Sequence, residues 1–478
     1  MKITAITLFA AIASAASSSS SSSLSSRDWV TPELAEEIDV QQKWNDVGGT
    51  RELACLANQL SGSDKIPRLS IDSALEQVVV HSDELDSGGG GGHHHHGDAS
   101  KTIYELIKES KYTTRFAKLV DKYDDIKDLL SDTEKSNHTL FVPTDRAFEH
   151  IPDHDDDDDE DDKHREFIHS ALLYHIAPGL YPVRRVLLSH TIASNLTLST
   201  LGTYPQRIRV GISLLRGVRF NFWSKLVAGN IIAKNGVIHA VDAILVPPPP
   251  TAKIIQLLPG TFSTLSLGFE KTGLEDELAD LPHYGGTLFA PTNRAFTKLG
   301  RRANAFLFSE HGKRYLKALL RYHVVANETL YSDAYYKKKS EDDDDDDENI
   351  ETAKLWQEEV TPAGVEDYWH IDLPSLLNDK AINVDVRRWR GFISILINGR
   401  VRVAVQDGVA SDGVVQVVNS VLIPPHRHPH HGGDDEGSLS GRDGEVNVDE
   451  LKERLEPYLA ENEEESARGG KRFVDEDL

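Results

Sequence analysis

The sequence predicts an α+β fold that is built twice in tandem, and three repeated blocks carry this prediction. Residues 139–148 recur as residues 287–296, which start 148 positions later. The Tyr174-His175 pair recurs at the same offset as Tyr322-His323. A fixed offset between matching blocks indicates a duplicated structural unit. The third block, residues 235–247, recurs as residues 412–424, so the second copy contains an additional 29 residues.

Helices are expected at the start of the first repeat. Apolar residues recur there at spacings of three or four, which is typical of helices with one buried face; they are Ile103, Leu106, Ile107, Phe116, Leu119 and Val120. Leu140 to Val142 then predicts a short buried strand that ends at Pro143. Thr144 and Asp145 are residue types that cap the next helix.

The later part of each repeat predicts strands. Asn398-Gly399 separates two β-branched segments, 393–397 and 401–403, and this dipeptide favours the type I′ turn of a hairpin. Residues 236–246 and 413–423 are rich in β-branched residues and are followed by proline, so each predicts a closing strand. Helices that precede a strand-rich half favour the α+β class.

Composition and low-complexity segments set the domain boundaries. Met1-Lys2, an apolar run and the small residues 13–15 predict a signal peptide, which is too short to span a membrane. The expected organisation is a signal peptide at 1–16, a low-complexity and weakly structured region with a Gly/His linker at 17–99, domains at 100–248 and 249–425, an acidic insertion at about 337–365, and a polar acidic tail at 426–478. The acidic inserts and the tails are expected to be disordered.

Charge and cysteine content exclude several classes of partner and site. The net charge is −25, which repels nucleic acid. A single cysteine excludes an intramolecular disulfide. After signal cleavage no apolar stretch predicts an integral membrane segment, and the charged residues 461–478 give no lipid-anchor signal.

The three blocks resemble those of the fasciclin-type domain, and the resemblance covers roughly residues 100 to 425 in both copies. It implies a β-wedge or sandwich with packed helices, while the composition of the chain suggests a secreted, fungal-type protein. The resemblance also implies adhesion to a cell-surface or matrix protein or glycan, and attaches this role to Tyr174, His175, Tyr322 and His323. Apolar neighbours favour the alternative that each pair is buried and orders a helix end. The second copy departs from the pattern at Ser411-Asp412 and Gln416.

No catalytic residue, cofactor site or metal site is predicted. The sequence contains no nucleophile elbow, phosphate-binding glycine loop or zinc-protease helix, so we expect a protein that is not an enzyme. Two acidic runs, 155–162 and 341–348, lack the spaced ligands of a calcium loop. Histidine clusters at 93–96 and 426–431 lack the fixed ligand spacing of a zinc site.

Export would expose three glycosylation sequons, at Asn137, Asn195 and Asn327. Asn137 precedes an expected buried strand, whereas the other two lie in more polar surroundings. The function predicted is adhesion or interaction at the cell surface, cell wall or outside the cell. Two alternatives stay open: a trafficking or membrane-fusion factor in the vacuole or the secretory-pathway lumen, and an acid-rich protein that sequesters metal.

Overall fold

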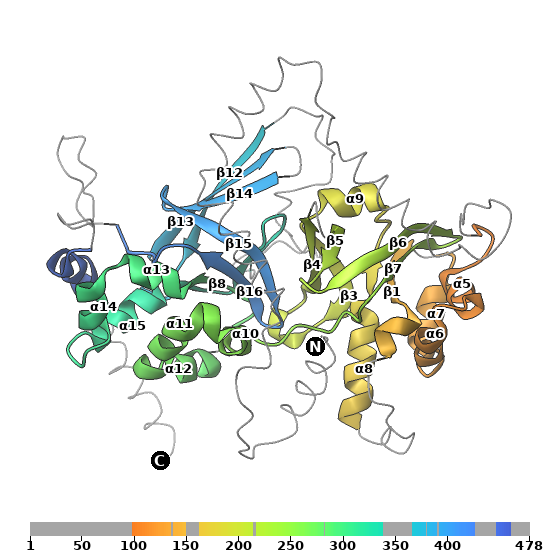
Figure 1. The fold of residues 1–478 in the computed structure, drawn as a ribbon, viewed down its shortest axis with the longest axis horizontal. Coiled ribbons are helices and arrows are strands. Elements are labelled where there is room, and N and C mark those ends of the chain that lie inside the picture. Colours follow the sequence, from red (N-terminus) through yellow and green to blue (C-terminus); the bar gives the residue numbers. More distant parts are fainter. Residues whose placement is uncertain are drawn as a thin grey trace, which may run out of the picture. The chain divides into compact units, whose positions relative to one another are not determined.

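A computed structural model describes residues 98–134, 137–149, 162–213, 217–281, 283–337, 366–378, 380–389, 392–425 and 446–459 (Figure 1). The chain divides into two compact units, Met1–Pro249 and Pro250–Leu478. The expected signal peptide, the N-terminal region, Cys55, both histidine clusters and nearly all of both acidic runs lie outside the described residues.

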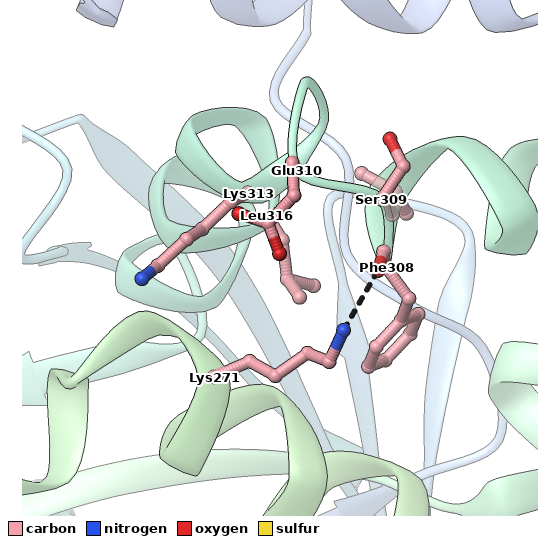
Figure 2. A pocket seen from close by; sticks show the side chains of 7 residues that line it. Lys271, Phe308, Ser309, Glu310, Lys313 and Leu316 are labelled. Atoms are coloured by element: carbon pink, nitrogen blue, oxygen red, sulfur yellow. Dashed lines mark hydrogen bonds between the residues drawn. The ribbon is translucent and has the colours of Figure 1, made fainter.

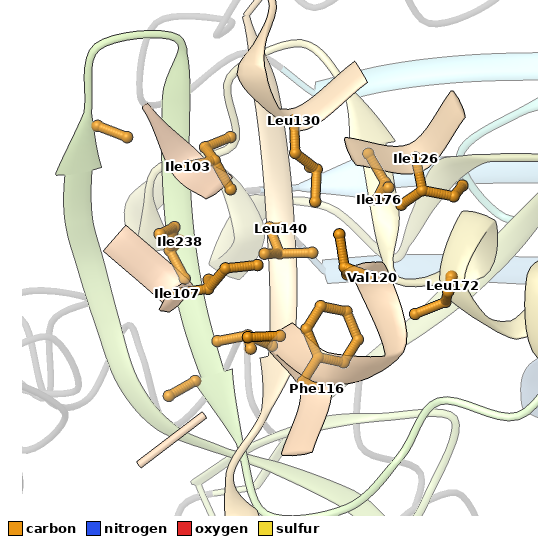
Figure 3. Packing of buried hydrophobic residues seen from close by; sticks show 14 of the residues in the cluster. Ile103, Ile107, Phe116, Val120, Ile126, Leu130, Leu140, Leu172, Ile176 and Ile238 are labelled. Atoms are coloured by element: carbon orange, nitrogen blue, oxygen red, sulfur yellow. The ribbon is translucent and has the colours of Figure 1, made fainter. Parts of the chain in front are cut away.

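Unit 1 begins with three short helices, α5 (Ile103–Glu109), α6 (Thr114–Asp121) and α7 (Asp124–Ser131). A capping box starts α5, because the Thr102 hydroxyl accepts from the Glu105 N–H and the Glu105 carboxylate accepts from the Thr102 N–H. The apolar faces of these helices point toward Leu140 and Ile238 and form one core (Figure 3). The predicted helical spacing therefore corresponds to a buried face.

One sheet joins the rest of unit 1, in the strand order β2-β1-β7-β6-β5-β4-β3. The strands are β1 (His138–Pro143), β2 (Ile176–Pro178), β3 (Thr191–Thr197), β4 (Pro205–Ser213), β5 (Gly217–Phe220), β6 (Ser224–Ala233) and β7 (Gly236–Val241). Between them lie η2 (Asp145–Phe148), α8 (Asp162–Tyr174), α9 (Val183–Leu188) and η4 (Ser199–Leu201). Strand β1 pairs with β7 in parallel, so the first and third repeated blocks are neighbours at the centre of the unit.

Unit 2 repeats this plan. Its helices are α10 (Thr251–Leu257), α11 (Pro259–Thr272), α12 (Leu274–Asp280), α13 (Asn293–Lys298), α14 (Arg301–Leu307) and α15 (Lys313–Arg321). Its main sheet has the order β12-β13-β14-β15-β16-β8-β9, built from β8 (Gly286–Pro291), β9 (Val324–Ala326), β12 (Glu366–Pro374), β13 (Ala381–Trp389), β14 (Phe392–Ile397), β15 (Val401–Ala410) and β16 (Gly413–Val418). A separate hairpin is formed by β10 (Glu328–Leu330) and β11 (Tyr335–Lys337). Strands β8 and β16 are parallel, as β1 and β7 are. The predicted α+β class with two tandem repeats is confirmed.

Glycine is required where the third block approaches the first. A Cβ on Gly236 would lie 1.9 Å from the carbonyl oxygen of His138, and a Cβ on Gly413 would lie 2.2 Å from that of Gly286. The predicted hairpin is also present, since Asn398 and Gly399 both have positive φ angles, 49° and 66°. The Arg400 N–H closes this turn by donating to the Ile397 carbonyl at 3.0 Å.

Two local predictions were wrong. The closing strands end at Val241 and Val418 rather than near residues 246 and 423. The chain leaves the ladder because the N–H groups of Leu245 and Leu422 donate to buried histidine rings instead. In repeat 1, Thr144 makes no side-chain cap; the Asp145 carboxylate instead accepts from the N–H of Arg115 at 2.8 Å, across the start of α6.

The expected polar tail contains an ordered helix at residues 448–459. Its inner side buries Leu451, Leu455 and Tyr458. The helix is attached to unit 2 because the Val446 N–H donates to the Leu299 carbonyl at 3.1 Å and Tyr315 donates to Glu456. The tail prediction missed this helix because charged residues dominate the segment by count, while the apolar ones recur at helical spacing.

Candidate interaction site

The Tyr-His pairs lie inside the two units. Tyr174 ends α8 and His175 follows it, and their side chains are 0% and 2% exposed. Tyr322 and His323 follow α15 and are both 0% exposed. A direct contact between these side chains and a partner would need the folded unit to open.

Each histidine joins a helix end to the segment after the last strand. In unit 1, His175 Nδ1 lies 2.7 Å from the Ala171 carbonyl, and Nε2 accepts from the Leu245 N–H at 2.9 Å. In unit 2, His323 makes the same bonds to Leu319 at 2.8 Å and Leu422 at 2.9 Å. Since Nε2 accepts, Nδ1 carries the proton and the ring is neutral. Burial lowers the pKa of each ring to about 4.

Each tyrosine is held by an asparagine that the sequence analysis did not single out as a site residue. Tyr174 donates to the Arg207 carbonyl at 2.9 Å and accepts from Asn221 Nδ2 at 2.8 Å. The corresponding bonds of Tyr322 go to Ala381 at 3.2 Å and Asn398 at 3.0 Å. Burial raises the pKa of Tyr174 and raises that of Tyr322 to about 12.

Both asparagines adopt the left-handed region, with φ angles of 47° at Asn221 and 49° at Asn398. Asparagine tolerates this region better than most residues. The one sequence signal for this role was the Asn-Gly turn at 398, which was interpreted only as a hairpin.

The departures of the second copy preserve the geometry. Asn235 accepts from the Ile103 N–H and its replacement, Asp412, accepts from the Thr251 N–H, both at 2.8 Å. Each therefore holds the N-terminus of the first helix of its unit. At the second departure, Gln416 replaces His239, and both side chains contact a backbone carbonyl. His239 Nε2 lies 2.7 Å from the Tyr181 carbonyl, and Gln416 Nε2 donates to the Leu330 carbonyl at 2.8 Å.

The predicted glycosylation residues differ in exposure. Asn137 is exposed, whereas Asn195 in β3 and Asn327 are partly buried. Asn327 has a φ of 63° and its side-chain oxygen accepts from the Tyr284 N–H at 3.0 Å. Thr139 of the Asn137 sequon is fully buried, and its hydroxyl donates to the Gly179 carbonyl at 2.8 Å.

A shallow cavity of about 50 Å³ lies between α11 and the start of α15 (Figure 2). It is lined by Lys271, Leu307, Phe308, Ser309, Glu310, Lys313 and Leu316. Lys271 Nζ crosses it and donates to the Phe308 carbonyl at 2.9 Å. Ligand pockets are typically about 300 Å³ or larger, so this cavity has room only for a few water molecules.

Exposed aromatic and charged side chains gather on the outer face of β12, β13 and β14. Tyr368 is 54% exposed and Phe392 is 72% exposed. Tyr368 donates to Asp385 Oδ1 at 2.6 Å, and His370 Nδ1 lies 2.7 Å from the same oxygen. The guanidinium of Arg387 lies 5.6 Å from the centre of the Tyr368 ring. This surface is called the outer face below.

The hydrogen bonds on the outer face shift three pKa values. The bond to Asp385 raises the pKa of Tyr368. The bond to Asp385 raises the pKa of His370, and the bonds from His370 and Tyr368 lower the pKa of Asp385. Asp385 is therefore charged at neutral pH. Within the described ranges, no group of three or more histidine, cysteine or acidic side chains is placed to hold a metal ion.

None of the helices in the part of the chain that the structure describes is long and apolar enough to cross a membrane.

Comparisons with known proteins place this architecture in a family. The fasciclin-domain profile matches residues 111–247 and 260–424. The aurofusarin biosynthesis cluster protein S of the fungus Gibberella zeae is 31% identical over 346 residues, which cover 69% of this chain and 78% of that protein. Mouse stabilin-2 is 30% identical over 200 residues, which cover 39% of this chain and 7% of stabilin-2.

Human periostin is 30% identical over 160 residues, which cover 34% of this chain and 18% of periostin. A solved FAS1 domain pair from the insect cell adhesion molecule fasciclin I covers 65% of this chain and 96% of that structure, at 16% identity and a TM-score of 0.29. The two profile matches fall within the two repeats, and in each unit the first and third repeated blocks form neighbouring parallel strands. The chain therefore belongs to the fasciclin family and carries two tandem fasciclin domains.

Proposed function

We propose that this chain is a secreted, non-enzymatic adhesion or interaction protein that binds a cell-surface or matrix protein or glycan. The observation that carries the proposal is the pair of fasciclin-domain matches, at 111–247 and 260–424. Matched segments of stabilin-2 and of periostin support it. The sequence of the first residues, which is typical of a signal peptide, supports export.

The two Tyr-His pairs serve this function indirectly. Each pair is buried, and its four hydrogen bonds connect a helix end, a strand and the segment after the last strand. We assign them the role of holding the domain in shape, while partners bind to surface residues. Burial of hydrogen-bonded polar groups is the usual arrangement in a folded interior.

Adhesion by beads coated with the purified full-length chain tests the proposed function. Coated beads should bind to the surface of producing cells, or to each other, more than beads coated with an unrelated protein of similar negative charge. Recovery of the chain from the medium or wall extract should accompany binding. Beads that adhere no better than the control, together with retention of the chain in an internal compartment, would favour the trafficking alternative.

The Gibberella zeae relative favours a second candidate function. That protein is named for a biosynthesis cluster, and this chain spans 78% of it. An accessory role, in which the domains hold a biosynthetic enzyme outside the cell, would use the same fold without catalysis. Purification of the tagged chain from culture medium distinguishes the two, because stoichiometric recovery of an enzyme supports the accessory role and recovery with wall material supports adhesion.

A further inference from the structure

We propose that the outer face of unit 2 binds a neutral oligosaccharide. This inference rests on the proposed function and names the partner class for one surface. The face is built by Tyr368, His370 and Asp372 on β12, Asp385 and Arg387 on β13, and Phe392 on β14. Register places these side chains on one side of the sheet, because Tyr368 lies opposite Arg387 and His370 lies opposite Asp385.

The fold itself does not need this face, as unit 1 shows. Equivalent hydrogen bonds show which residues of the two units correspond. The Asn221 N–H donates to the Arg209 carbonyl in unit 1, and the Asn398 N–H donates to the Asn383 carbonyl in unit 2. Arg209 in β4 therefore corresponds to Asn383 in β13. Arg209 pairs with Thr191, the first residue of β3, and Asn383 pairs with Asp372 in β12, so Thr191 corresponds to Asp372. Tyr368 and His370 therefore lie on an extension of β12 that β3 lacks.

The neighbouring hairpin is extended in the same way. Strand β5 begins at Gly217, which pairs with Ser213 of β4. The corresponding pair in unit 2 is Ser394 with Arg387, so Gly217 corresponds to Ser394. Phe392 precedes Ser394 and so has no counterpart in β5. At the shared position next to this extension, unit 1 has Gly211 where unit 2 has Asp385. The aromatic and charged groups are thus additions to a scaffold that folds without them in unit 1.

The size of the outer face favours a small extended ligand over a protein. Its length, from the row of Phe392 to the row of Asp372, is about 20 Å, and three strands are about 10 Å wide. The resulting area of about 200 Å² is far below the roughly 800 Å² that each partner contributes to a stable protein interface. A few sugar rings match this area.

The side chains also match the chemistry of a sugar. Pyranose rings have an apolar C–H surface, which packs on an aromatic ring, and a rim of hydroxyls that donate to carboxylates and accept from guanidinium groups. Tyr368 is held in place by Asp385, so its ring is already oriented. Two carboxylates, those of Asp372 and Asp385, lie beside the guanidinium of Arg387 on this face and disfavour an anionic saccharide.

Binding of the full-length chain to immobilised oligosaccharides tests the inference. The probes are neutral hexasaccharides of glucose, mannose and N-acetylglucosamine, with a uronic-acid hexasaccharide as the anionic comparison. At least one neutral probe should bind. Tyr368→Ala should weaken its binding about tenfold and Phe392→Ala several-fold, as expected for aromatic residues at the centre of a binding surface.

Tyr112→Ala is the matched control, because Tyr112 is 57% exposed in unit 1 and its loss removes an equal ring from a different surface. It should leave binding unchanged, and all variants should keep the parent circular dichroism and melting temperature. The inference is overturned by binding that Tyr368→Ala and Phe392→Ala leave intact, by preference for the uronic-acid probe, or by no neutral probe binding at millimolar concentration. Adhesion of coated beads that survives Tyr368→Ala would retain the proposed function while removing this face from it.

Discussion

At the scale of single residues, each Tyr-His pair acts through hydrogen bonds inside its own unit. Tyr174 satisfies the Arg207 carbonyl and the Asn221 amide, and both bonds lie inside unit 1. Tyr174→Phe keeps the ring, removes one donor to the Arg207 carbonyl and takes from the buried Asn221 amide its bond to the hydroxyl, so we expect unit 1 to lose about 2 kcal/mol of unfolding free energy.

Chemical denaturation, with hydrogen exchange followed in peptides from each unit, measures this loss. Tyr112→Phe is the control, since Tyr112 is exposed and its hydroxyl is accessible to water. Equal stabilities of Tyr174→Phe and the parent would show that the buried hydroxyl contributes nothing net.

At the scale of secondary-structure elements, the helix at 448–459 extends unit 2 beyond the family match, which ends at 424. Leu451 and Leu455 are fully buried in it. A chain that stops at residue 445 should therefore lose several kcal/mol of unfolding free energy in unit 2, because burial of each leucine contributes about 2 kcal/mol.

A chain that stops at residue 459 is the matched control, since it keeps the helix and removes only the charged segment that follows. Differential scanning calorimetry should show a lower melting temperature for the first truncation and no change for the second. A lowered melting temperature in both would assign the effect to the charged end rather than to the helix.

At the scale of the whole molecule, repetition made most of the fold predictable. The three blocks, with the Asn398-Gly399 turn, predicted two α+β units and the hairpin that the structure contains. The features that the sequence did not predict depend on contacts between residues far apart in the chain. The Leu245 N–H, beyond the end of β7, donates to His175, which lies 70 residues away in the sequence. No local sequence pattern near Leu245 predicts this bond. Likewise, the outer face depends on strand register, which places Tyr368 and Asp385 side by side.

The two units should also differ in their response to acid. Unit 1 buries His138, His175 and His239, and burial lowers the pKa of all three, to about 4 for His175 and His239, whereas unit 2 buries His323 and has Gln416 at the second position. An unfolded histidine has a pKa of about 6.5, so the unfolded chain binds more protons between pH 6.5 and 4. Each ring therefore contributes stability that is full above pH 6.5 and is lost as the pH falls toward 4.

The difference is testable in the intact chain by hydrogen exchange at a series of pH values. Unit 1 should lose more unfolding free energy than unit 2 between pH 7 and 4, with the rings of His175, His239 and His323 accounting for about 3 kcal/mol each at most. In unit 2, exposed His370 has a raised pKa, which adds a little stability on acidification and widens the difference. His239→Gln, which copies the residue of unit 2, should reduce the pH dependence of unit 1 by the contribution of that one ring. Equal acid sensitivity of the two units in the parent chain would mean that these rings are protonated without unfolding.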